Sequence, residues 1–139
     1  MFELNEENQV NRPQIGDKAI IISLNFNDIN HNESTEELIQ LSISAGFHVS
    51  EIVTSKRNAP DAKLFIGSGK AEELMLIKDA TEATTLIFNH ELTPSQERNI
   101  EKLLSLRVYD RTALILYIFA QRAKSYEGKL QVELAHLAH

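Results

Sequence analysis

A glycine turn that contains a lysine is the feature of this sequence closest in type to a phosphate-binding site. In the stretch LFIGSGKAEE, an apolar run leads into Gly67, Ser68, Gly69 and Lys70, and a helical segment follows. Phosphate-binding loops combine the free backbone N–H groups at a helix N-terminus with a lysine ammonium group. These four residues are therefore a weak candidate site for an anion or an RNA phosphate.

The spacing around this turn does not fit a nucleotide-binding loop. A Walker A motif needs a glycine where this chain has Leu64, and a Ser or Thr where it has Ala71. The dinucleotide fingerprint needs a third glycine at the position of Glu72. Glu72 and Glu73 are also predicted in the first helical turn, where they would repel a phosphate. A plain strand-to-helix turn is the favoured interpretation, and we predict no nucleotide or other cofactor in this chain.

Other patterns that suggest metal binding or catalysis are sparse. Glu133, His136 and His139 share a helical face, but they lie at the end of the chain without supporting residues, so we predict no metal site. No Ser-His-Asp set can be assembled, and the absence of cysteine excludes thiolate and disulfide chemistry. We therefore expect no catalytic residue. The remaining histidines are isolated and are predicted to lie on the surface or in loops: His31, His48 and His90.

Three cations near the end of the chain are candidate RNA contacts: Arg122, Lys124 and Lys129. They surround a helix break that we predict between Ser125 and Gly128. Cations at a helix C-terminus stabilise the helix dipole, whereas a cluster of cations can contact RNA phosphates. The residues alone do not decide between these two roles.

The elements that position these residues alternate between strand and helix. Apolar runs predict strands over Lys18–Leu24, Phe47–Thr54 (at an edge), Lys63–Ile66, Thr84–Phe88 and Leu106–Tyr109. Helices are predicted from Ser34 to Gly46, Ser68 to Ala80, Thr93 to Leu104 and Thr112 to Lys124. Capping boxes, which pair Ser34 with Glu37 and Thr93 with Gln96, support two of these starts.

This alternation predicts an α/β fold, with a mostly parallel sheet, helices on both faces and the start of a long helical linker after them. We assign residues 1–16 to a flexible N-terminal arm, 17–124 to the α/β domain and 125–139 to the linker. The helix over Thr112–Lys124 is so apolar that it must be buried against the sheet or a partner, with Leu114, Ile115, Ile118 and Phe119 on one face.

The composition is that of a folded domain that is not strongly basic. The 139 residues are 42% apolar with a formal net charge of −6, whereas sequence-blind nucleic-acid binders are usually basic. Residues 1–51 carry nine acids and two bases, but residues 52–139 carry eleven acids and twelve bases, so the second part can approach a polyanion. No apolar run reaches the ~20 residues that span a membrane. With an acidic start and no cysteine, the chain is predicted to be cytoplasmic.

Two stretches carry a resemblance to a known family. LFIGSGKAEEL and, more specifically, DRTALILYIFAQRAKSYEGKLQVELAHL resemble the N-terminal region of the HflX family of GTPases, over roughly Ala45 to His139. Two positions differ from the family pattern. Ala113 stands where a glycine is usual, and Tyr117 stands where an acid is usual, which argues against a polar role at position 117.

The resemblance implies an α/β domain, then two long antiparallel helices and a G domain beyond residue 139. It implies a cytosolic GTPase that binds the large ribosomal subunit and splits stalled ribosomes, with GTP and Mg²⁺ held by the missing G domain. The present chain would then be a non-catalytic domain that docks on ribosomal RNA and regulates its own G domain.

Two alternatives remain open at this stage. Some members of the family are thought to bind ATP through this region, so the first alternative is an independent ATP-binding or RNA-binding module. The second concerns Leu130, Leu134 and Leu137, which would lose the partner helix that the family supplies. The segment after Glu127 is then expected to fray, to pack back on the domain, or to support weak self-association.

Overall fold

The computed structural model describes residues 16–26, 29–56 and 66–137, with side chains of the last helix described as far as residue 131. Within these residues, four strands form one parallel sheet in the order β2-β1-β3-β4. The strands are β1 (Lys18–Asn25), β2 (His48–Lys56), β3 (Thr85–Phe88) and β4 (Arg107–Tyr109). The helices are α2 (His31–Ser44), α3 (Ser68–Thr81), α4 (Pro94–Leu104) and α5 (Arg111–Leu137). The predicted α/β fold with a parallel sheet is confirmed.

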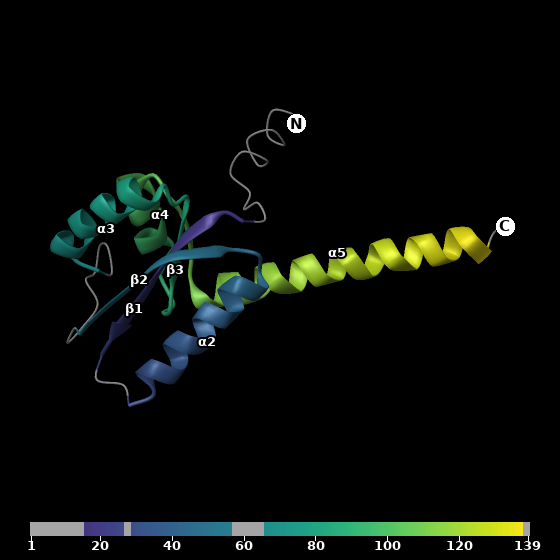
Figure 1. The fold of residues 1–139 in the computed structure, drawn as a ribbon, viewed down its shortest axis with the longest axis horizontal. Coiled ribbons are helices and arrows are strands. Elements are labelled where there is room, and N and C mark those ends of the chain that lie inside the picture. Colours follow the sequence, from purple (N-terminus) through teal and green to yellow (C-terminus); the bar gives the residue numbers. More distant parts are fainter. Residues whose placement is uncertain (1–15, 27–28, 57–65, 138–139) are drawn as a thin grey trace.

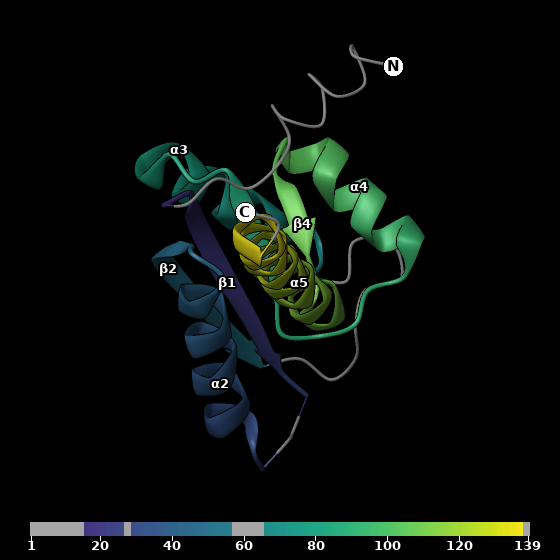
Figure 2. The same cartoon turned by 90° about the vertical axis from the view of Figure 1, so that its right-hand side faces the viewer.

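Helices cover both faces of the sheet (Figure 2), and the alternation of side chains along β1 supplies both cores. Ile20 and Ile22 pack with residues of α3 and α4, whereas Ala19 and Ile21 pack with residues of α2 and α5. A strand buried on both faces needs apolar side chains at successive positions. This requirement explains the uninterrupted apolar run in the sequence of β1.

The strand order creates a topological switch point between β1 and β3, from which the chain continues toward opposite edges of the sheet. From β1 the chain continues through α2 to the edge strand β2, and from β3 it continues through α4 to β4 on the other side. Because α2 and α4 lie on opposite faces, the loops that leave β1 and β3 diverge at the carboxyl ends of these strands. In open parallel sheets, ligands usually bind in the crevice that forms between such diverging loops.

Several local predictions are confirmed. The strand predicted over Phe47–Thr54 is the edge strand β2, and Thr93 caps α4 in a complete capping box with Gln96. Gly46 follows α2 with a φ of +99°, a backbone conformation that glycine adopts without strain.

Two helix boundaries differ from the prediction. Helix α2 begins at His31, three residues before Ser34, so the predicted capping box there is wrong. Helix α5 continues without interruption through Ser125–Gly128, so the predicted break is also wrong. One glycine in a helix interior costs only about 1 kcal/mol relative to alanine, and the strong helix formers around Gly128 outweigh that cost.

Two other predictions fall largely outside the described residues. The strand over Lys63–Ile66 lies there except for Ile66, which is fully buried but not in a strand. The N-terminal arm lies there except for Gly16, whose N–H donates to the Gly46 carbonyl oxygen at 2.8 Å.

Truncation of a buried side chain in the central strand should lower the free energy of unfolding far more than truncation of an exposed leucine. Ile21→Ala removes a fully buried side chain between α2 and α5, and we expect a loss of about 2–5 kcal/mol in the free energy of unfolding. The control is Leu76→Ala on the outer surface of α3, which should stay within about 0.5 kcal/mol of the wild type. Equal losses in a denaturant titration of the two variants would contradict the assignment of this core.

Candidate functional site

A polar network lies at the carboxyl ends of β1 and β3, on the face that α2 and α5 cover. Ser23 is fully buried, and its hydroxyl oxygen lies 2.6 Å from Thr35 Oγ1 and 3.0 Å from His31 Nε2, both on α2. Thr35 donates its own hydroxyl proton to the His31 carbonyl oxygen at 2.8 Å, so Ser23 is the donor to Thr35. His31 Nε2 must then donate to Ser23, which assigns the proton on the ring.

Asn89 connects this cluster to the start of α5. Its amide nitrogen donates to Ser23 Oγ at 3.1 Å and to Ser34 Oγ at 2.9 Å, and its amide oxygen accepts from Arg111 Nη1 at 2.8 Å. The other guanidinium arm, Nη2, forms an ion pair with Glu37 Oε1 on α2. Because Asn89 is buried, removal of a partner would leave one of its amide groups unsatisfied at a considerable cost.

Asp110 fixes the start of α5 through its carboxylate. Oδ1 accepts from the Ala113 N–H at 2.8 Å, as a helix N-cap does, and Oδ2 accepts from the Leu92 N–H at 3.2 Å. This arrangement explains in structural terms why an aspartate stands directly before α5. Ala113 lies in regular helix with a negative φ, so the glycine that is usual at this position in HflX proteins is not required.

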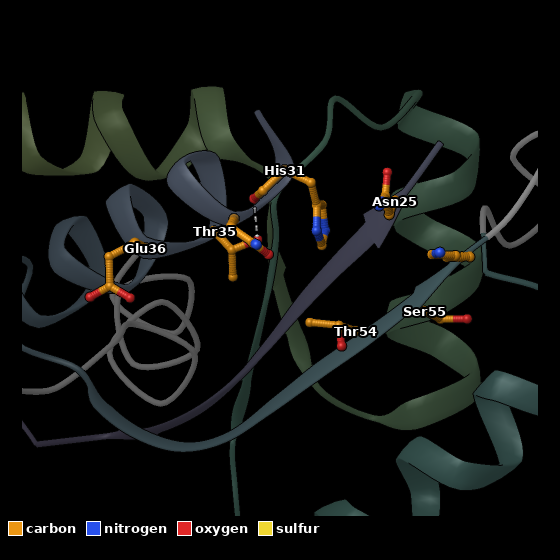
Figure 3. Close-up of a pocket in the computed structure, with 8 residues that line it drawn as sticks. Asn25, His31, Thr35, Glu36, Thr54 and Ser55 are labelled. Carbon is orange, nitrogen blue, oxygen red and sulfur yellow. Dashed lines mark hydrogen bonds between the residues drawn. The ribbon is translucent and has the colours of Figure 1, made fainter. Parts of the chain in front are cut away.

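A pocket of about 490 Å³ opens beside the network, between α2 and the ends of β1 and β2 (Figure 3). Its lining residues come from the two strands and from the first turns of α2: Asn25, Thr54, Ser55, Lys56, His31, Asn32, Thr35 and Glu36. His31 and Thr35 belong to both the pocket and the network. The charges of Lys56 and Glu36 offset one another, so the lining does not select an anion.

The glycine turn lies at the start of α3. Gly67 precedes the first helical residue with a φ of +78°, which explains why a glycine stands there. Lys70 Nζ pairs with Glu73 Oε2 at 2.8 Å, and the side chain of Ala71 is buried where a Walker A loop needs a hydroxyl. Ser68, Gly69 and Lys70 belong to the first helical turn. Glu72 and Glu73 lie in the second turn, so their predicted place in the first turn is wrong.

Helix α5 projects from the domain and carries the three predicted RNA contacts (Figure 1). Its 27 residues span about 40 Å. Residues 122–131 are all exposed, so the described side chains make little contact with the domain after Gln121, whose Nε2 donates to the Ala45 carbonyl oxygen at 3.1 Å. At about 100° per residue, Arg122 and Lys129 share one side of the helix, whereas Lys124 points to another side.

Helix α5 has two apolar faces. Leu114 and Ile118 are buried on the sheet, and Tyr117 packs near Phe47 and Tyr109, with ring centroids 6.2 Å and 5.8 Å away. The apolar packing of Tyr117 agrees with the absence of the acid that is usual at this position. An opposite stripe of exposed residues alternates in steps of three and four: Leu116, Phe119, Ala123, Tyr126 and Leu130.

This second stripe has the spacing of a coiled-coil seam, in which apolar residues repeat every 3.5 positions on average. It runs from the part of α5 that lies on the sheet to the part that projects. Phe119 is 64% exposed whereas Leu114 is fully buried, so the predicted burial of Phe119 against the sheet, together with Leu114, is wrong. Leu134 and Leu137 lie beyond the described side chains.

The histidines have more structural roles than the sequence suggests. His48 is exposed at the start of β2, as predicted. His90 lies in a loop, where its Nε2 accepts from the Leu24 N–H at 3.0 Å, and His31 belongs to the polar network, so neither is isolated. Among the described residues, no group of three or more acids and histidines is placed to hold a metal. The side chains of Glu133, His136 and His139, for which no metal site is predicted, lie outside the described part.

Sequence reasoning missed the network itself, whose members are Ser23, His31, Ser34, Thr35, Glu37, Asn89 and Arg111. The sequence signal for this network was the position of two polar residues at the carboxyl edge of the sheet. Ser23 lies near the end of one buried apolar strand, and Asn89 directly follows another.

No helix in the part of the chain that the structure describes has the length and apolarity needed to cross a membrane.

The surroundings of Glu97 disfavour the ionised form of its carboxyl group, and this should affect stability in a pH-dependent way. Burial, and then repulsion by Glu101 and Asp110, raises the pKa of the Glu97 carboxyl above its ordinary 4.5. A raised pKa means that ionisation of Glu97 destabilises the folded state at neutral pH, and that this effect vanishes below the ordinary pKa. Glu97→Gln should therefore raise Tm at pH 7 and leave it unchanged below pH 4. A Tm increase of equal size at both pH values would contradict this cause.

The glycine turn should not support nucleotide binding. With Lys70 paired to Glu73 and no hydroxyl at position 71, we expect neither ATP nor GTP to bind this chain at sub-micromolar concentration. Titration calorimetry with each nucleotide and Mg²⁺ would measure this directly. Tight binding that Lys70→Ala abolishes, while Lys78→Ala leaves it intact, would make the turn a nucleotide site.

Known proteins share both the sequence and the fold. The sequence model of a family described as GTP-binding GTPase N-terminal matches residues 32–120. GTPase HflX of Escherichia coli (strain K12) is 46% identical over 128 residues, which cover 92% of this chain and 30% of that protein. GTPase HflX of Caldanaerobacter subterraneus subsp. tengcongensis is 41% identical over 123 residues, which cover 88% of this chain and 28% of that protein.

A solved structure extends the likeness to the fold. It is a GTP-binding protein from the hyperthermophilic archaeon Sulfolobus solfataricus in complex with GDP, with a TM-score of 0.61 at 33% identity. The match covers 87% of this chain and 36% of that one. The present chain thus spans about three tenths of the curated relatives' length. The chain belongs to the GTP-binding GTPase N-terminal family and corresponds to the N-terminal domain of the HflX GTPases.

Proposed function

We propose that this chain is a non-catalytic domain through which an HflX-type GTPase docks on the large ribosomal subunit and regulates its own G domain. In the whole protein, this docking would serve to split stalled ribosomes in the cytoplasm. The observation that carries the proposal is the geometry of α5, a helix that is rooted in the sheet and projects with exposed cations.

The unbroken helix favours RNA contact for these cations over a purely structural role. Stabilisation of a helix C-terminus requires cations in the last turn. Arg122, Lys124 and Lys129 instead lie well inside a helix that ends at Leu137. Their side chains are exposed on the part of α5 that leaves the domain, where a polyanion can approach them.

GTP and Mg²⁺ belong to the part of the relatives that this chain does not span. The turn at Gly67–Lys70 does not fit a nucleotide phosphate, because the lysine is engaged by Glu73 and the Mg²⁺-binding hydroxyl is replaced by Ala71. No step of GTP hydrolysis is therefore assigned to residues of this chain.

The second apolar stripe of α5 offers a route to the G domain. In the HflX family, a second long helix follows and packs antiparallel to the first. The exposed seam from Leu116 to Leu130 has the spacing that such a helix needs. A helix pair of this kind would join the α/β domain to the G domain as a stiff connection. In the isolated chain, the same stripe favours weak self-association.

The runner-up function is an independent ATP-binding or RNA-binding module. The observation that favours it is the pocket between α2 and β2, which is large enough for a small ligand. Titration of the chain with labelled ATP, GTP and large ribosomal subunits separates the two functions. Binding of the subunit without nucleotide supports docking, whereas binding of ATP alone supports the module.

Removal of the exposed cations should weaken ribosome binding in a salt-dependent way. We expect Arg122→Ala combined with Lys129→Ala to reduce the affinity for large subunits. It should also reduce the slope of log affinity against log salt by about 0.7 to 0.9 for each phosphate that the variant no longer neutralises. Lys124→Ala, on another side of α5, tests whether a single face of the helix is used. Sedimentation at several salt concentrations measures the slopes.

The matched control removes two exposed cations elsewhere. Arg98→Ala with Lys102→Ala on α4 makes the same change in net charge on a part of the surface remote from the end of α5. Equal weakening in both double variants would show a general charge effect. Unchanged binding with a Tm several degrees lower in the α5 variant would assign the cations to the fold rather than to RNA.

A further inference from the structure

Besides its apolar packing on the sheet, α5 makes two polar contacts with the neighbouring helix α2. At its first residue, Arg111 reaches Glu37 in the middle of α2, and ten residues later Gln121 donates to the carbonyl oxygen of Ala45, the residue that caps α2. Both contacts are polar and directional. They lie about 15 Å apart along α5, so together they define a line rather than a point.

The first of these contacts also connects α5 to the sheet. Arg111 Nη1 donates to Asn89 Oδ1 at 2.8 Å, and the buried Asn89 amide nitrogen donates to Ser23 at the end of β1 and to Ser34 on α2. The planar guanidinium group thus binds two acceptors on different elements at once. A lysine ammonium group has no such two-armed geometry.

We propose that Arg111 is a positioning residue, which sets the angle at which α5 leaves the α/β domain. Beyond Gln121 the described side chains of α5 are exposed, so they make little contact with the domain that could restrain the helix. A change in the direction of α5 at Arg111 would therefore carry through to its projecting part. A pivot of ten degrees at Arg111 displaces residue 125 by about 4 Å, and the end of the helix by about 7 Å. The biological use of this angle rests on the proposed function of α5 as the ribosome-facing arm, but the angle itself does not.

The absence of cysteine from the sequence makes the angle directly measurable. Ser125→Cys on the projecting part of α5 and Asp79→Cys on α3 provide two exposed positions for spin labels. Pulsed electron paramagnetic resonance then gives the distribution of distances between them in the 139-residue chain. We expect one narrow distribution with Arg111, and a distribution displaced by several ångströms or clearly broadened with Arg111→Gln.

Two further variants make the result decisive. Arg111→Lys keeps the charge and the helix propensity but lacks the planar fork that holds both acceptors, so it should also displace or broaden the distribution. Arg98→Gln on α4 is the matched control and should leave it unchanged. If Arg111→Gln fails to fold, the lysine variant alone decides the question.

The proposal is overturned if the folded Arg111 variants keep the wild-type distance distribution, even where their Tm is lower. Such a result would make Arg111 a stabilising ion pair without influence on direction. Because no ribosome is present in the experiment, this failure is distinct from a failure of the proposed docking function. A displaced α5 in a variant that still binds ribosomes normally would uphold the positioning role and reject the docking arm.

Discussion

The burial of β1 between two strands and two helical layers is the constraint on which the rest of this structure depends. Every side chain from Ala19 to Leu24 is nearly or completely removed from solvent. Five of these six residues are apolar, and the exception, Ser23, lies where the strand meets the carboxyl edge of the sheet. A buried hydroxyl needs partners, and Thr35, His31 and Asn89 supply them. The polar network thus forms at the place where the apolar run is interrupted.

The sequence contains enough information for the layers but not for the network. Continuous apolar runs and local signals such as the Thr93 capping box depend on residues close together in the chain, and these predictions are confirmed. The bonds of the network join residues far apart, such as Ser23 with Asn89 and Glu37 with Arg111. Their pairing depends on the strand order, which the alternation of elements does not reveal. The same is true of the angle of α5.

The two errors at helix boundaries have different physical origins. Ser34 and Glu37 have the spacing of a capping box, but tertiary contacts use their side chains instead, since Ser34 accepts from Asn89 and Glu37 pairs with Arg111. At Gly128, the local cost of a glycine is smaller than the combined preference of the neighbouring helix formers. In the first case a long-range partner overrides a local preference, and in the second the preference of the whole helix overrides one residue.

The cations of α5 lie beside the second apolar stripe, and this position links the two contacts proposed for the helix, with RNA and with a partner helix. If Leu116 occupies position a of a heptad, then Phe119, Ala123, Tyr126 and Leu130 follow at d, a, d and a, and Arg122 and Lys129 both fall at g. Side chains at g flank the seam and commonly pair with acids of a partner helix. A helix that covers the stripe would therefore restrain these two side chains. Phosphate could then reach them only from the side that faces away from the partner helix. Contact with RNA and contact with the partner helix would then be linked, because the residues proposed to bind the ribosome also border the proposed connection to the G domain.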